Sequence, residues 1–380
     1  SGEVDIQKFI QLSERSEYTT PQALKLEVED KVLTISQDFI ASKFKGIGLF
    51  KVMYFLYDHF DLFSTFKISN ETFFHFLFDL RNSYNRVPYH NWMHAVDVCQ
   101  FLAFSINTSE LVKIFTKFEI LAMLTAAVCH DANHDGFSNQ YNVKAQTPLG
   151  ILFKNQSVME THHCSVSIGI IAKDDCNIFK TLNESESIRM WTLFIDLILA
   201  TDMAKHFIII DKAKEFGKDS WPKTEEGRLM MMKLLIKLAD ISNCARKLEI
   251  AEKWVNVLCE EYFRQGEFEK ANGMEYSSPM NDREHLDKAK SQITFISAVC
   301  LPLFELIVTF VPHLQPIIDK VKLNLEMWKK IEAEKQKELE RHREEEEQKE
   351  KEKKKLNQDI DDEKNIEKES LDKEKDNVKS

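Results

Sequence analysis

Apolar residues recur three and four positions apart along most of the chain, which is the spacing of one buried face of an α-helix. Sustained alternation of apolar and polar residues is rare, and two-residue hairpin turns between apolar runs are lacking. The pattern therefore predicts an all-α fold with many medium-length helices in one compact body. Helices are expected over 32–63, 69–84, 89–101, 118–129, 158–172, 188–210, 224–241, 248–263 and 292–311.

Three stretches lack this period. Residues 1–31 are mostly polar and are expected to form a loose lead-in. Residues 131–157 predict a long, partly structured loop, and loops of that length in a compact domain tend to be functional. Residues 266–287, which contain Gly273 and Pro279, predict a mobile loop.

The composition changes near Trp328. Residues 329–380 hold sixteen Lys or Arg and nineteen Asp or Glu, for a net charge of −3, with few apolar residues and no sustained heptad. The front of this tail is expected to extend a solvated helix through Glu–Lys pairs four residues apart, and the rest is expected to be disordered. The expected body therefore spans 32–328.

Bulk composition adds limits to this picture. The chain of 380 residues has a formal net charge of −11, which argues against a nucleic-acid-binding surface. Its seven cysteines include no CxxC pair, so we expect reduced thiols and a cytoplasmic location. We expect no signal peptide and no membrane span, since no run reaches about 18 apolar residues. The start at Ser1-Gly2 suggests a longer parent protein, whose membrane association stays open, as does a homodimer.

Half of the 12 histidines fall within one third of the chain, among acidic residues. His90 and His94 are four residues apart, so on a helix they would share one face. His130 and Asp131 end a strongly apolar run, and Asp240 ends another. Two nitrogen and two oxygen ligands, a set that suits zinc or another divalent ion, would come from His94, His130, Asp131 and Asp240.

A second cation is expected beside Asp131, because its carboxylate can bridge two ions about 3.5–4 Å apart. Water between the ions would become a nucleophile near neutral pH, since both charges lower its pKa. The second ion would keep waters, as magnesium prefers, held by His134, Glu160, His163 and Thr201. Alone, Glu160 would be interpreted as a surface carboxylate and Thr201 as an ordinary helix hydroxyl.

His90 is left over if His94 is a ligand. A free imidazole in the same cleft can protonate a leaving alkoxide, which is the role of a general acid. The alternative is a structural histidine bonded to a backbone carbonyl. The residues taken together predict a metal-dependent phosphohydrolase.

The segment Tyr89-His90-Asn91-Trp92-Met93-His94-Ala95 resembles the YHNxxHA signature of class I cyclic nucleotide phosphodiesterases. Residues 130–139 (HDANHDGFSN) resemble the family's HDxxHxGxxN block. Further blocks follow in the family's order at 160–163 (ETHH), 201–203 (TDM), 239–243 (ADISN) and 290–295 (KSQITF). The resemblance runs from about Val32 to Trp328.

This resemblance implies an all-helical catalytic domain over 32–328. The domain would hydrolyse cAMP, cGMP or both to nucleoside 5′-monophosphates and so end cyclic nucleotide signalling. It implies Zn²⁺ on the four ligands, Mg²⁺ or Mn²⁺ bridged through Asp131, and His90 as the proton donor to O3′. Gln292 would hydrogen-bond the purine edge, and the rest of the purine pocket would be Tyr89, Asn243, Leu258 and Phe295. From composition alone, Leu258 and Phe295 would be ordinary core residues.

Three positions depart from the family's usual residues. Asn133 stands where an acid is common, Asp135 where Pro or Arg is common, and Thr294 where Gly is frequent. None is a ligand position, so activity should be retained. The nucleotide preference stays open, because a Gln side chain can present its amide either way round to adenine or guanine.

Two other functions stay open. Another HD-type phosphohydrolase could act on nucleoside monophosphates or triphosphates, but simpler relatives of that kind need neither His90 nor Gln292. A non-catalytic, cyclic-nucleotide-sensing helical module is the second alternative. The complete ligand set argues against it, because a degenerate site would have lost a ligand.

Overall fold

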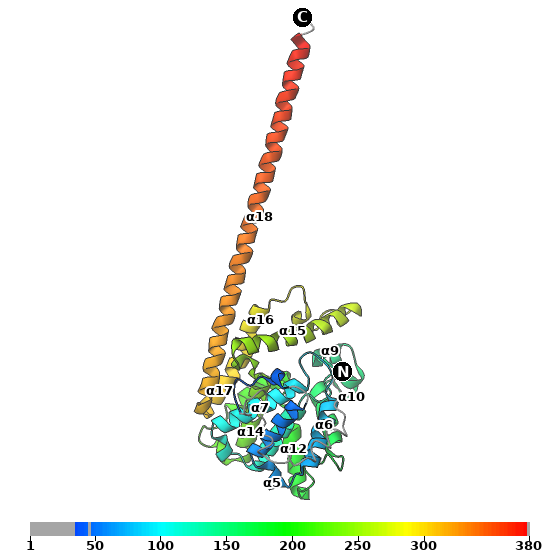
Figure 1. The fold of residues 1–380 in the computed structure, drawn as a ribbon, viewed down its shortest axis with the longest axis vertical. Helices are drawn as coiled ribbons and strands as arrows, with labels where there is room; N and C mark the ends of the chain where they lie inside the picture. Colours follow the sequence, from blue (N-terminus) through cyan, green and yellow to red (C-terminus); the bar gives the residue numbers. More distant parts are fainter. Residues whose placement is uncertain (1–34, 45–46, 378–380) are drawn as a thin grey trace. The chain divides into compact units, whose positions relative to one another are not determined.

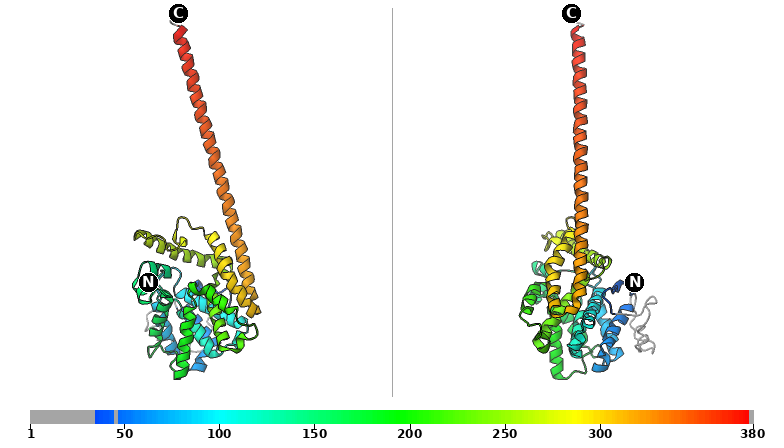
Figure 2. Two further views of the ribbon diagram at one scale, coloured as in Figure 1. Left: turned by 180° about the vertical axis from the view of Figure 1, so that it is seen from behind. Right: turned by 90° about the vertical axis from the view of Figure 1, so that its left-hand side faces the viewer.

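The computed structural model describes residues 35–44 and 47–377, and every regular element within them is helical (Figures 1 and 2). The predicted all-α fold is thus confirmed, while the predicted lead-in over 1–31 lies outside the described residues. The α-helices are α4 (Gly48–His59), α5 (Leu62–Phe66), α6 (Asn70–Ser83), α7 (Trp92–Thr108), α8 (Lys117–Cys129), α9 (Asn139–Lys144), α10 (Pro148–Leu152), α11 (Val158–Ile171), α12 (Glu184–Leu199), α13 (His206–Ala213), α14 (Glu225–Asp240), α15 (Leu248–Ala271), α16 (Lys288–Phe295), α17 (Leu301–Phe310) and α18 (Gln315–Asn377).

The core is built around α8. From Glu119 to Cys129 every residue of this helix is buried. A helix that is apolar on all sides needs neighbours on all sides, and α8 packs against α7 and α12, while α7 also packs against α14. This packing brings the C-terminal ends of α8 and α14 and the N-terminal part of α7 into one region.

The start of α7 is set by Asn91. Its side chain accepts hydrogen bonds from the backbone N–H groups of Met93 and His94 at 2.9 and 3.4 Å. Such a cap satisfies N–H groups that have no partner inside the helix. The prediction that one helix carries both histidines is therefore wrong for His90, which lies in the turn before the cap. The two rings are still close, with centroids 5.9 Å apart.

The single helix predicted over 188–210 is also wrong, because the structure has α12 and α13 with a turn between them. Asp202 causes the break. Its backbone is not helical, and its carboxylate accepts the N–H of Ala204 at 2.8 Å in place of a helical acceptor. Thr201 and Asp202 consequently lie between two helices.

The loop predicted over 266–287 begins later than expected, because α15 continues through Gly266 to Ala271. A Cβ on Gly266 would lie 2.1 Å from the carbonyl oxygen of Asn281, so only glycine permits this approach. The helix thus packs directly against the short 3₁₀ helix Pro279–Asn281. Glycine here serves close packing and does not mark a loop.

The apolar helix predicted over 292–311 is observed as α16, a π-helical turn (Ile296–Cys300) and α17. Pro302 follows the π turn and has no N–H to donate, which accounts for the change in the hydrogen-bond ladder. Among the described residues, Lys288–Phe310 is 23 residues long and contains an 18-residue window with a mean hydropathy of 2.2, of which 28% is buried, so by length and composition it could cross a membrane. Core helices pass the same test, and the expected absence of a membrane span stays a prediction.

The charged tail forms part of α18, which runs as one helix to Asn377 (Figure 2). The disorder expected for its rear part is replaced by helix in the structure. Residues 329–380 contain neither Gly nor Pro, and pairs such as Glu350–Lys354, at 3.1 Å, join successive turns. The first compact unit ends at Leu325 and the second begins at Glu326.

Candidate metal and catalytic site

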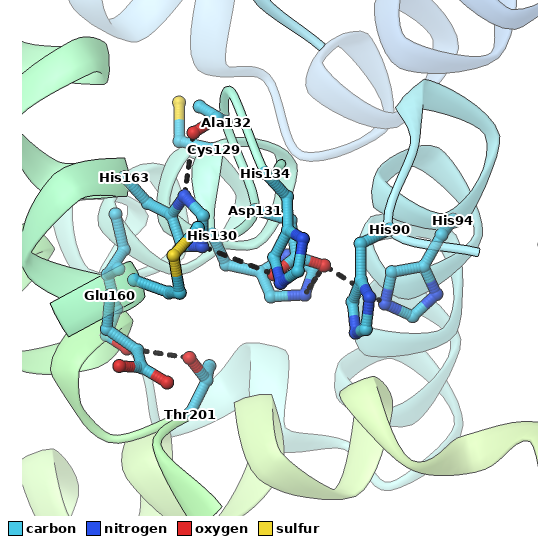
Figure 3. A network of polar contacts seen from close by, with 12 residues as sticks. His90, His94, Cys129, His130, Asp131, Ala132, His134, Glu160, His163 and Thr201 are labelled. Atoms are coloured by element: carbon cyan, nitrogen blue, oxygen red, sulfur yellow. Dashed lines mark hydrogen bonds and ion pairs between the residues drawn. The ribbon is translucent and has the colours of Figure 1, made fainter. Parts of the chain in front are cut away.

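Four donor atoms from three parts of the chain surround one point, and Figure 3 shows the histidine rings and Asp131 among them. Nε2 of His94 on α7 and Nε2 of His130 after α8 each lie 3.2 Å from Oδ1 of Asp240, the last residue of α14. Oδ2 of Asp131 lies 3.4 and 3.1 Å from the same two nitrogens. Zinc with ligand bonds of about 2.0–2.1 Å holds tetrahedral ligand atoms about 3.3 Å apart. The spacing therefore fits a tetrahedral cation site.

Hydrogen bonding and burial at this point also fit a cation. Nδ1 of His130 donates to the carbonyl of Ala127 at 2.7 Å, which turns Nε2 toward the other donors. Among the described residues, Oδ2 of Asp131 is buried without a hydrogen bond of acceptable geometry. Burial favours the neutral ring of His130, but Asp131 and Asp240 outweigh it and raise the pKa well above its usual value. A buried centre that attracts a proton so strongly also attracts a metal ion.

The second oxygen of Asp131 faces another group of donors. Oδ1 lies 3.8 Å from Nε2 of His163, and ligand atoms of Asp131, His134 and His163 all lie within 4.8 Å of one another. Nδ1 of His163 bonds the carbonyl of Ala132 at 2.7 Å, which directs Nε2 inward. Burial lowers the pKa of His163 to about 4 and that of His134 well below its usual value. Both rings are therefore neutral at pH 7. His163 offers Nε2 as an acceptor, whereas Nδ1 of His134 accepts the Gly136 N–H at 2.9 Å, so Nε2 of His134 carries the proton and can donate to a water.

Glu160 and Thr201 approach the same region from α11 and from the turn after α12 (Figure 3). Burial, followed by the charge of Asp202, raises the pKa of Glu160 to about 7. The Asn139 amide holds this carboxylate at 2.9 and 3.2 Å. The hydroxyl of Thr201 donates to the carbonyl of Ile198 at 2.8 Å, so its lone pairs stay free to accept.

One cavity of about 570 Å³ joins these groups. It is lined by most of the residues that the sequence nominated for the metals and their waters: His90, Asp131, His134, Glu160, His163, Thr201 and Asp240. His94 and His130 stand behind this wall, each about 1% exposed or less. The structure thus brings together the predicted metal ligands, the candidate water-holding residues and the candidate acid.

Glu261 on α15 is a further residue of the site, which was not predicted from the sequence. Its carboxylate makes a short contact with Nδ1 of His90 and accepts the backbone N–H groups of Tyr89 at 2.8 Å and His90 at 3.1 Å. Burial lowers the pKa of His90, but the charge of Glu261, followed by those of Asp131 and Asp240, raises it to about 9. His90 is therefore protonated at pH 7 and bound to the backbone turn through one carboxylate.

A signal for Glu261 was present in the sequence. It lies seven residues after Trp254 and four before Gln265, so all three share one face of α15, and all three are buried. A carboxylate on the apolar face of an amphipathic helix needs a partner. The periodicity could not name that partner, because His90 lies 171 residues away in the sequence.

The residues predicted to bind the purine do not all line one cavity. The Asn243 amide donates to the hydroxyl of Tyr89 at 2.6 Å, and the Tyr89 ring lies 4.5 Å from that of His94, between centroids. Phe295 lines a second cavity of about 820 Å³. Met280 lines both cavities, so they adjoin at this side chain.

Gln292 and Leu258 line neither of these two cavities. Gln292 is buried, with an exposed fraction of 7%, and its amide makes no hydrogen bond to any described residue. Neither the NH₂ group nor the oxygen of this amide is therefore engaged by another described residue.

The buried donors and the cavity beside them are suited to a divalent cation. The family model of 3′5′-cyclic nucleotide phosphodiesterases matches residues 89–321, and the chain belongs to this family. The family implies dependence on divalent metal ions, and the ligand atoms of His94, His130 and Asp131 lie close enough together to hold such an ion.

Individual relatives share a moderate fraction of identical residues with this chain. The high affinity cGMP-specific 3′,5′-cyclic phosphodiesterase 9A of Homo sapiens is 37% identical over 262 residues, which cover 69% of this chain and 44% of the relative. A probable 3′,5′-cyclic-AMP phosphodiesterase, pde-4 of Caenorhabditis elegans, is 33% identical over 278 residues, or 71% of this chain and 41% of the relative. The chain thus spans less than half the length of either relative.

Solved structures share the fold over most of the chain. The phosphodiesterase domain of Salpingoeca rosetta rhodopsin phosphodiesterase superimposes with a TM-score of 0.76 at 28% identity, covering 89% of this chain and 98% of that one. LmjPDEB1 in complex with IBMX superimposes with a TM-score of 0.75 at 30% identity, covering 83% and 98%.

Proposed function

We propose that this chain hydrolyses 3′,5′-cyclic nucleotides to nucleoside 5′-monophosphates. The observation that carries the proposal is the position of His90, which is held by Glu261 in a cavity lined by Asp131 and Asp240, with His94 and His130 directly behind these two carboxylates. Phosphodiester hydrolysis needs a cation centre to withdraw charge from the phosphate and an acid for the leaving alkoxide. The names of the relatives, one cGMP-specific and one for cyclic AMP, support this substrate class.

For the metals we propose Zn²⁺ on His94, His130, Asp131 and Asp240, because two imidazoles and two carboxylates at tetrahedral spacing suit zinc. We propose Mg²⁺ or Mn²⁺ beside Oδ1 of Asp131, where His134, Glu160, His163 and Thr201 would hold its waters. When bound, these cations would polarise the phosphate and lower the pKa of water to about 7.

The protein's own part in the reaction is to place a proton and to hold the substrate. His90 would give the proton on Nε2 to O3′, since Nδ1 is engaged by Glu261. The ring is fixed by stacking on His134, with centroids 4.1 Å apart. The stacking and the Glu261 contact leave the imidazole one orientation, so its proton stays directed at the cavity.

For the base, we propose that both adenine and guanine are accepted. The amide of Gln292 has no protein partner among the described residues, so it could turn either way toward a purine edge. Phe295 and Leu258 would contact the purine faces, while Tyr89 and Asn243 would border the nucleotide.

The test is a product assay on the purified chain with Mg²⁺ or Mn²⁺. We expect cAMP and cGMP to give the 5′-monophosphates, with kcat/KM values within about tenfold of each other, which is the range that one hydrogen bond spans. Nucleoside triphosphates and monophosphates are run beside them. Turnover of those compounds alone would favour another HD-type phosphohydrolase, and metal binding without any turnover would favour a sensing module.

We also propose a reducing, cytoplasmic setting, because all seven cysteines are buried and unpaired. The homodimer stays a prediction, which light scattering of the purified chain can test.

A further inference from the structure

Glu269 is a buried carboxylate outside the metal cavity. It lies on α15 and is 0% exposed. An ionised carboxylate in that position needs several hydrogen bonds to offset the loss of water. Its oxygens accept from Gln265 at 3.0 Å, from the Ser277 N–H at 3.1 Å and from Asn281 at 3.1 Å, and the Ser277 hydroxyl makes a fourth, short contact.

These partners fasten the segment 274–281 to α15. The backbone N–H of Met274 also donates to the carbonyl of Glu269 at 2.9 Å. Gly266 lets Asn281 sit directly against the helix. Met280, within the fastened segment, lines the metal cavity and the cavity of Phe295. The position of Met280 therefore depends on the hydrogen bonds of Glu269.

Gln265 extends the same network to the opposite wall. Its amide oxygen accepts the N–H of Ser138 at 2.8 Å, and its amide nitrogen lies 3.2 Å from the Ser138 hydroxyl as well as 3.0 Å from Glu269. Ser138 caps α9 and lies between Phe137 and Asn139, which both line the metal cavity. The carboxylate of Glu269 is thus connected, through Gln265, to two parts of the cavity lining. These parts are far apart in the sequence, since Ser138 and Gln265 are separated by 127 residues.

We propose that Glu269 is a positioning residue that sets the nucleotide-binding wall of the cavity through the segment 274–281. The inference rests on the proposed function for its substrate, but its structural part stands separately. Glu269 touches neither the metal donors nor His90, so its loss should change how well the nucleotide is held and leave the proton transfer intact.

The perturbation is Glu269→Gln. A carboxylate accepts all four contacts, whereas an amide has one oxygen and one NH₂ group. Whichever way round the amide lies, at least one donor loses its acceptor. We expect KM for cAMP and cGMP to rise about tenfold, the size of one lost hydrogen bond to a charged group. We expect kcat and the zinc content to stay at the wild-type level.

The matched control is Glu267→Gln, two residues away on α15. Glu267 is exposed and pairs with Arg283 at 2.7 Å, and exposed ion pairs contribute little. Its KM should stay unchanged. A readout independent of turnover is hydrogen exchange of the Ser277 amide, which should speed up in Glu269→Gln and stay protected in the control.

If Glu269→Gln does not fold, Ser277→Ala decides the question. It removes one contact and leaves the backbone N–H in place, so KM should rise by a smaller factor, about threefold. An unchanged KM or unchanged exchange at residue 277 would overturn the proposal, and so would a fall in kcat that follows zinc loss. A wild-type chain without turnover would remove the proposed function, and the exchange result would still decide the role of Glu269.

Discussion

The pairing of His90 with Glu261 leads to a sharp prediction for Glu261→Gln. One carboxylate oxygen, Oε2, accepts the N–H groups of Tyr89 and His90, and the other, Oε1, contacts Nδ1 of the ring. The amide oxygen of glutamine would keep the two backbone hydrogen bonds. Its NH₂ group would then face Nδ1, which must become an acceptor. His90 would lose its positive charge and move its one proton to Nε2, a much weaker acid.

The magnitude follows from the pKa. The surrounding groups raise the pKa of His90 from 6.5 to about 9, and among those that raise it Glu261 is the largest. The difference between a pKa of 6.5 and one of about 9 corresponds to about 3 kcal/mol in favour of the protonated ring. Bound cations would offset the charges of Asp131 and Asp240, so Glu261 becomes the main support of the charged ring. We expect kcat to fall about 10²-fold, at the lower end of the range for general-acid catalysis.

The raised pKa of His90 also predicts how kcat/KM changes with pH. An acid must be protonated, so kcat/KM of the wild type should fall as pH rises through the pKa of His90. In Glu261→Gln this fall should begin at lower pH, nearer 6.5. The same raised pKa stabilises the folded state: its contribution is complete below 6.5 and is lost as pH rises through about 9.

The assay is kcat and kcat/KM for cAMP from pH 6 to about 10 with saturating Mg²⁺, over the range set by the pKa of His90. Glu260→Gln is the control, because this neighbour is exposed and pairs with Arg264 and Arg283 on the surface. A Glu261→Gln variant with wild-type kcat and an unmoved alkaline limb would refute the reasoning.

Four further predictions concern the metals, the base and the tail. Asp240→Ala should lose zinc and turnover together by metal analysis and assay, because His94 and His130 lose the oxygen 3.2 Å away; full zinc content would exclude Asp240 as a ligand. A zinc chelator should abolish turnover and lower the unfolding temperature, and an unchanged melting curve would show that the site binds no structural cation. Gln292→Ala should lower kcat/KM about tenfold for both nucleotides, and a loss confined to one would show that the amide is fixed. Deleting residues 336–380 should leave kcat/KM within about twofold, since residues 336–355 are all exposed; a collapse would show that the tail supports the site.

The sequence reveals three of the four candidate metal donors because they stand at the ends of apolar runs. His130 and Asp131 follow α8 and Asp240 closes α14, so local periodicity predicts their position, whereas His94 lies in the first turn of α7. The helix class of the body follows in the same way. Both rest on spacing within a single element, which the order of residues records directly.

What the sequence could not reveal are contacts that join distant elements. His90 was expected on a helix with His94, but Asn91 caps that helix first and Glu261 fixes the turn from another part of the chain. The break at Asp202 depends on a side chain that caps one helix and also binds the hydroxyl of Ser157 at 2.7 Å. The spacing of apolar residues carries no information on such partners. It therefore predicts the site residues that lie near a helix end and misses those that depend on a distant contact.

The electrostatics of the site explain why these distant contacts are needed. One buried region of the site contains several acidic side chains, which are Asp131, Asp240, Glu160 and Asp202. Lys237 is a buried cation that interacts with these acidic groups. It is 2% exposed, and its ammonium donates to the carbonyls of Ala200 and Asp202 at 3.0 and 3.4 Å.

Burial lowers the pKa of Lys237 to about 8, although the same acids raise it, so it is still largely charged at pH 7. Lys237 and the protonated His90 leave part of this negative charge unbalanced, and the remainder favours the binding of a divalent cation. A divalent cation bound at this cluster would complete it, which accounts for the acidic charge that the fold keeps there.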